Sequence, residues 1–173
     1  NVQLGLYLDS DGSGTLTASL GGITANVPIE IAGTRSNYHA DFIRDVSPVI
    51  AKVGCNAGTC HGAKEGKNGF KLSLRGYDPI ADVRALTDDL ASRRVNLASP
   101  DDSLMLLKAV AEVPHEGGRR MTMDSAYYQI LRQWIANGAG LETNAPKGVK
   151  IDVFPQDPVV QQIGSRQQMR IVA

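Results

Sequence analysis

Residues 55–61 read CNAGTCH, and they hold both cysteines of the 173-residue chain and one of its three histidines. Cys60 is followed at once by His61, while Cys55 lies five positions before Cys60. The segment before this run, residues 42–53, has apolar side chains at helical spacing and is closed by Gly54. The sequence therefore predicts a loop that follows a helix and carries two thiols beside an imidazole.

Two cysteines with a histidine directly after the second are the pattern that attaches haem covalently. Each thiol forms a thioether with one haem vinyl group, and the histidine ligates the iron. The usual spacing leaves two residues between the cysteines, whereas this chain has four. Gly58 suits an outward bulge, because glycine adopts positive φ without steric cost. We therefore expect Cys55, Cys60 and His61 to bind haem c, with His61 as the proximal ligand.

Two other fates of the cysteines compete with haem. A disulfide across four intervening residues is geometrically feasible in an exported protein. A zinc ion could instead take Cys55, Cys60, His61 and His115, although adjacent residues such as Cys60 and His61 rarely fit one tetrahedron.

Composition excludes several function classes. Eighteen basic and eighteen acidic residues balance, so the composition indicates no broad cationic surface, and we expect no nucleic-acid or anionic-lipid partner. No run of 18 apolar residues occurs, so no membrane span is expected. The histidines and acids show no pattern of nucleophile, base and orienting partner, so we expect that the protein is not an enzyme. We also expect this part of the chain to be a monomer.

The apolar period divides the chain into three segments. Residues 1–35 alternate as β-strands, with a hairpin turn expected at 9–14 and a strand at 23–31 that buries one face. Residues 40–140 have helical spacing, and residues 148–173 return to strand-like alternation at 149–153 and 167–173. A linker is expected at 141–148.

Three further helices are expected in the middle segment. Asp78 and Pro79 predict a start for a helix that continues to about Leu90, and Ser99 with Pro100 predict the start of the next. The last helix is capped by Asp124 or Ser125 and stops at residues 137–138.

Five stretches, residues 54–62, 66–79, 93–96, 113–115 and 134–135, are similar to the planctomycetal cytochrome c domains of large exported proteins, which lie between bacterial immunoglobulin-like modules. The resemblance implies one haem c, a role in electron transfer and no particular redox partner. With the helical spacing it gives the expected fold class: a mainly α cytochrome c-like domain with flanking β-strand segments, α+β overall. The flanks resemble the end of one immunoglobulin-like module and the start of the next.

The residue opposite His61 decides the reduction potential. His115 is the first candidate, and Met121 or Met123 in the same loop is the alternative; Met105 and His39 are further candidates. Two histidine ligands predict a six-coordinate, low-potential haem, because methionine ligation raises the potential. An open site opposite His61 remains a third arrangement.

Residues 69–77 are the expected pocket wall. Phe70 and Leu72 alternate toward the haem, while Arg75 and Tyr77 are expected to reach its propionates. The arginine pairs at 93–94 and 119–120 are equal candidates, and a plain surface hairpin at 69–77 is the competing interpretation.

Electron transfer by a single covalently bound haem c is thus the predicted function, with an unidentified redox protein as the partner. Covalent haem attachment takes place outside the cytoplasm, so an extracytoplasmic location follows from the haem hypothesis, and the start at Asn1 fits a processed or excised piece of a larger exported protein. The alternatives are a structural or adhesion module with a disulfide or zinc site, and a haem sensor or enzyme with an open distal site.

Overall fold

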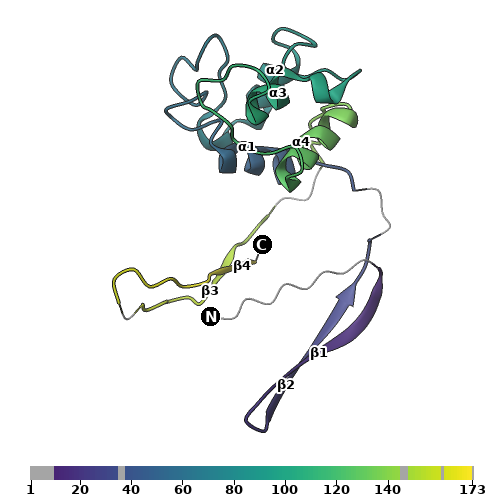
Figure 1. Ribbon diagram of the computed structural model, residues 1–173, viewed down its shortest axis with the longest axis vertical. Helices are drawn as coiled ribbons and strands as arrows, with labels where there is room; N and C mark the ends of the chain where they lie inside the picture. Colours follow the sequence, from purple (N-terminus) through teal and green to yellow (C-terminus); the bar gives the residue numbers. More distant parts are fainter. Residues whose placement is uncertain (1–9, 35–37, 145–147, 161, 173) are drawn as a thin grey trace. The chain divides into compact units, whose positions relative to one another are not determined.

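The computed structural model describes residues 10–34, 38–144, 148–160 and 162–172 (Figure 1). The expected strand around Leu4–Leu8 lies outside these residues. The chain is divided into two compact units, residues 1–39 and residues 40–173.

The first unit contains a β-hairpin. Strands β1 (Gly12–Leu20) and β2 (Ile23–Ile31) pair antiparallel, and Gly21 and Gly22 turn between them with φ of 57° and 83°. The strand at 23–31 is confirmed, but residues 12–14, expected in a turn, are part of β1. The expected buried face is also wrong, because side chains on both faces of the two strands are exposed or half-buried. A two-stranded sheet has no second layer of its own to cover it.

The second unit begins with a π-helical turn, η1 (Phe42–Val46), followed by α1 (Ser47–Val53). The sequence predicts one helix over this span, with Pro48 either kinking it or marking its true start. Pro48 occupies the first turn of α1 and supplies no backbone N–H, so the hydrogen-bonding pattern changes just before it. Gly54 ends α1 in the left-handed region, with φ of 88°.

Proline also begins two later helical segments, α2 and η3. Helix α2 (Pro79–Thr87) is capped by the Asp78 side chain, which accepts a hydrogen bond from the Ala81 N–H; the cap is confirmed, but the helix ends before Leu90. The Ser99–Pro100 signal begins only a 3₁₀ turn, η3 (Pro100–Asp102). Helix α3 (Leu104–Val110) follows it as a separate element.

Helix α4 (Ala126–Ala136) is the longest helix of the described residues. Its N-cap is Ser125, whose hydroxyl accepts the Tyr128 N–H at 3.2 Å, and Asn137 is its C-cap, as predicted. The Trp134 ring packs 5.3 Å from the Phe42 ring, centroid to centroid, so α4 is joined to η1 through the core. Every buried apolar residue of the described chain lies between Ala40 and Ala139.

A second hairpin, β3 (Asp152–Phe154) with β4 (Arg170–Val172), follows the helices in sequence. Both strands are shorter than the alternation at 149–153 and 167–173 predicts.

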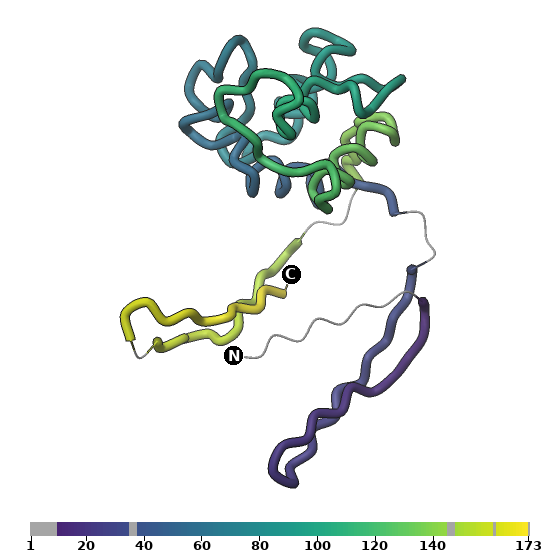
Figure 2. The backbone as a smooth tube through the Cα atoms, viewed as in Figure 1, coloured from purple at the N-terminus to yellow at the C-terminus, as the bar shows by residue number. Residues whose placement is uncertain are grey.

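The predicted fold class, a mainly α cytochrome c-like domain, is wrong. Helix takes 29% of the chain and strand 17%, which is a mixture of helices with two small sheets. The helices are short because proline or left-handed residues interrupt them, and the connections 54–73 and 111–125 contain no α-helix, as the tube in Figure 2 shows. The structure is therefore a weak α+β mix in which loops build much of the second unit.

Candidate functional site

The cysteine run forms a compact loop directly after α1. The Cys60 N–H donates to the Ala57 carbonyl at 2.9 Å, and the His61 N–H donates to the Cys55 carbonyl at 2.9 Å. The second bond brings the backbone of His61 back beside Cys55, although six positions separate them. The four intervening residues are thus accommodated as a folded turn.

Glycines beside the run matter more than the glycine within it. A Cβ on Gly62 would lie 2.1 Å from the Asn56 carbonyl oxygen, so only glycine fits there. Gly58 does not have a positive φ, and a Cβ on it would meet only Leu74 Cδ1 at 3.7 Å. The expectation of a positive φ at Gly58 was therefore wrong. The role of Gly62 was not predicted, because no sequence pattern indicates its close approach to Asn56.

A cavity of about 490 Å³ lies beside this loop. Both cysteines and His61 line it, as do apolar side chains from α1, α3, α4 and the loops, among them Ile50, Leu72, Leu104, Ala109 and Leu131. Its volume is within the usual range of about 300–1,000 Å³ for cofactor and ligand sites. The cavity is therefore large, mostly apolar and open to the two thiols.

The tautomer of His61 is set by its surroundings. Its Nδ1 lies 3.0 Å from the Phe70 carbonyl oxygen, which can only accept, so Nδ1 carries the proton and Nε2 keeps its lone pair. Burial lowers the pKa of His61, the hydrogen bond to Phe70 opposes that shift, and the charges of His115, Arg94 and Lys67 add to the lowering. A neutral imidazole held through Nδ1 is the usual state of a metal-ligating histidine.

His115 has the same arrangement on another loop. Its Nδ1 donates to the Gly118 carbonyl at 2.8 Å, which leaves Nε2 as the acceptor, and the residue lines the same cavity as His61. Gly117 makes room for the ring, since a Cβ there would lie 3.0 Å from His115 Cε1. The structure therefore brings His61 and His115 to one cavity from two separate loops.

The methionine candidates separate clearly. Met121, buried at 6% exposure, and Met105 line the cavity. Met123 is 48% exposed and is not among the described lining residues, and His39 belongs to the first unit. His115, Met121 and Met105 therefore remain the candidates opposite His61.

Only the first part of the predicted pocket wall, residues 69–77, lines the cavity. Phe70 and Leu72 line it, but Arg75 and Tyr77 are not among its described lining residues, and Tyr77 is 78% exposed. A 3₁₀ turn, η2 (Leu74–Gly76), in which Arg75 has φ of 58°, ends the extended run after Ser73. This turn is the reason why alternation from residue 70 does not continue to residue 77.

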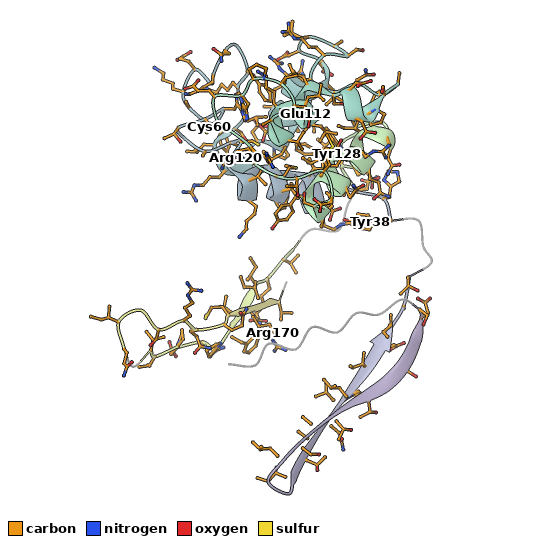
Figure 3. The ribbon with its side chains drawn as sticks, viewed as in Figure 1. Tyr38, Cys60, Glu112, Arg120, Tyr128 and Arg170 are labelled. Atoms are coloured by element: carbon orange, nitrogen blue, oxygen red, sulfur yellow. The ribbon has the colours of Figure 1, made fainter. Side chains whose placement is uncertain are left out.

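Cations from other segments take the place expected for Arg75. Lys67, Arg93, Arg94, Lys108 and Arg120 line the cavity, while Glu116 is the acidic residue among its described lining residues and pairs with Lys67 at 2.8 Å. Cys60 and Arg120, both labelled in Figure 3, line this cavity together. The lining therefore combines an apolar interior with an excess of positive charge, which suits an apolar ligand that carries carboxylates.

Both cysteines are free thiols, so the structure contains no disulfide between them. Burial raises the pKa of Cys55 to about 11, the positive charge of Arg120 opposes the shift, and Cys60 adds to it. Since the thiolate is the form that attacks disulfides and oxidants, Cys55 is a poor nucleophile toward them at neutral pH.

The zinc alternative finds no support in the geometry. Within the described ranges, no three His, Cys, Asp or Glu side chains gather as ligands for one metal ion. Cys55, Cys60, His61 and His115 therefore do not form a four-ligand zinc site. An iron held in a porphyrin needs only axial ligands from the protein, so this finding does not bear on haem.

Comparison of the chain with known protein families, with curated proteins and with solved structures finds no match. None of the helices in the described part of the chain is long and apolar enough to cross a membrane. The case for a function therefore has to be made from the cavity and its residues.

Proposed function

We propose that this chain holds one haem c between Cys55, Cys60 and His61 and passes single electrons to and from a redox partner. The supporting observation is His61, whose Nδ1–H is held by the Phe70 carbonyl inside an apolar cavity that both thiols also line. Bound there, haem would supply a one-electron iron couple. The proposal rests on the motif and the cavity, and it does not require the cytochrome c fold.

Each group at the cavity then has a defined task. Cys55 and Cys60 would anchor the two vinyl positions, and His61 Nε2 would ligate the iron. Arg93 and Arg120 are candidates to pair with the propionates, because both line the cavity and are exposed to solvent. Apolar side chains such as Leu72 and Met121 would keep water from the porphyrin face. The residues fit the cofactor in size, polarity and ligand chemistry.

His115 is proposed as the ligand opposite His61, with Met121 as the alternative. Its Nε2 is free to ligate because Nδ1 is engaged by Gly118, and it lines the same cavity. Two imidazoles predict a low potential, since methionine ligation is what raises it. Attachment outside the cytoplasm follows from the proposal. The resemblance of residues 54–62 to planctomycetal cytochrome c domains favours the same interpretation.

The first experiment is production of the full chain in a host that attaches haem c, followed by intact mass and the pyridine haemochrome spectrum of the denatured protein. One added haem, resistant to acid-acetone extraction and with the spectrum of two thioethers, supports the proposal. Cys55→Ala and Cys60→Ala should each give the single-thioether spectrum, whereas His115→Ala, as the matched control, should keep both thioethers. A colourless protein from a competent host would overturn the proposal in favour of a structural module.

A further inference from the structure

Arg94 is an arginine buried beside the cavity with few acidic neighbours. Its side chain is 8% exposed, and the nearest carboxylate that the structure gives, from Asp89, lies 3.9 Å away and is itself 67% exposed. The guanidinium instead donates to three backbone carbonyls: Ala85 at 2.7 Å, Asp89 at 3.0 Å and Gly69 at 2.9 Å. Desolvation of a charge without a close counter-ion is costly, so this position calls for an explanation.

The same guanidinium lies against Phe70. Its Cζ is 4.5 Å from the centroid of the Phe70 ring, in cation–π geometry. With the bond to the Gly69 carbonyl, Arg94 thus holds two consecutive residues, one by the backbone and one by the ring.

Phe70 in turn contacts His61 in two ways. Their ring centroids are 4.5 Å apart at an interplanar angle of 47°, and the Phe70 carbonyl accepts the His61 Nδ1–H at 3.0 Å. Arg94, Phe70 and His61 therefore form a continuous series of contacts, and all three line the cavity.

We propose that Arg94 is the positioning residue for His61: it fixes Phe70, and thereby the ring orientation and Nδ1–H tautomer of the imidazole, and it places a buried positive charge beside the cofactor site. The role of the buried charge rests on the proposed function, because the charge acts on the redox couple of a bound haem. A fixed positive charge favours the reduced form of the iron, so Arg94 opposes the lowering of the potential by a second histidine.

Lysine cannot replace arginine in this role. The planar fork reaches separate carbonyls while its face covers a ring, whereas an ammonium is a point charge that keeps a strong hydration shell. Arg94→Lys therefore separates the two parts of the proposal, since it keeps the charge and loses the fork. Arg94→Met removes both, and Phe70→Leu removes the ring while it keeps the carbonyl.

Two measurements on the full chain test the proposal. In chain produced without haem attachment, ¹⁵N NMR at a fixed pH of about 8 reports the His61 tautomer. We expect the Nδ1–H form in the native chain and in Phe70→Leu, and a mixture of tautomers in Arg94→Lys and Arg94→Met.

In haem-loaded chain, voltammetry measures the reduction potential. The Arg94→Met variant should shift the redox equilibrium about tenfold toward the oxidised form, which is a reduction potential about 59 mV more negative. Arg94→Lys should keep most of the native potential.

Arg84→Met is the control, because Arg84 is an exposed arginine of α2 that pairs with Asp88 and does not line the cavity. It should change neither the tautomer nor the potential. A folded Arg94→Met variant with the native tautomer and potential would overturn the proposal. If Arg94→Met does not fold, the Arg94→Lys tautomer decides, and a native-like Nδ1–H form there would also overturn it. Absence of haem from the native chain would defeat the proposed function alone, because the tautomer test needs no haem.

Discussion

At the residue scale, the two glycines on either side of Cys60 have unequal roles. Gly62→Ala would put a Cβ 2.1 Å from the Asn56 carbonyl oxygen, whereas Gly58→Ala adds an ordinary contact of 3.7 Å with Leu74. We expect Gly62→Ala to lower the free energy of unfolding by about 1–3 kcal/mol and to reduce haem attachment, because the loop must open. Urea unfolding of both variants measures this, and equal stability of the two would contradict the geometry.

His115 and Met121 are distinguished by single substitutions. In haem-loaded chain, His115→Ala should let carbon monoxide bind quickly to the ferrous iron and should raise the reduction potential, because an imidazole ligand is lost. Met121→Leu is the matched control and should leave the spectrum of the native protein unchanged. Stopped-flow spectroscopy gives the binding rates. The reverse pattern, with a rapid reaction only in Met121→Leu, would assign the position to the methionine.

At the scale of elements, Asp101 ties η3 to α4. Its Oδ1 accepts from the Tyr128 hydroxyl at 2.7 Å and from Arg132 Nε at 2.8 Å. Arg132, and after it Tyr128, lowers the pKa of Asp101, so the ionised carboxylate stabilises the fold above its ordinary pKa near 4, and this contribution is lost as the pH falls through the lowered value. Burial, and after it Asp101, raises the pKa of Tyr128 to about 12.

We therefore expect Asp101→Asn to destabilise the chain at pH 7 and the difference from the native chain to vanish well below pH 4. The Asp101–Arg132 pair is solvent-exposed, so its contribution should be under about 1 kcal/mol and should shrink with added salt. Urea unfolding across pH measures the effect. Asp124→Asn is the control, because the structure gives the Asp124 side chain no partner among the described residues. A difference that persists at pH 2 would show that the carboxylate charge is not its source.

The elements also show what the sequence could and could not predict. The sequence predicts helix α4 with a cap at Asp124 or Ser125 and an end at residues 137–138, because caps depend on residues within a few positions of each other. The structure places the cap at Ser125 and the end at Asn137. The prediction that Arg75 and Tyr77 lie at the cavity was wrong, because the left-handed φ at Arg75 redirects the chain. Arg94 appeared only as a propionate candidate, because the carbonyls it binds belong to three separate places in the sequence.

At the scale of the whole molecule, charge is balanced overall but not locally. Equal numbers of acids and bases give a formal net charge of zero, yet five cations and one acid line the cavity among the described residues. Composition alone cannot reveal this, because the basic residues come from segments as distant as Lys67 and Arg120. A local excess of positive charge is what an apolar cofactor with carboxylates requires.

The extent of the proposed haem-binding unit can be tested by truncation. All buried apolar residues of the described chain lie within residues 40–139, and the β1–β2 hairpin contributes none of them. A chain of residues 38–144 should therefore keep the melting temperature and haem spectrum of the full chain.

A chain of residues 38–138 is the matched comparison, because it loses buried Ala139 and the Gly140 carbonyl that accepts the Trp134 Nε1–H at 2.9 Å. We expect it to melt several degrees lower, since the lost bond leaves a buried donor without a partner, at a cost of about 1–3 kcal/mol. Equal melting of the two truncated chains would mean that the Trp134 bond does not close the core.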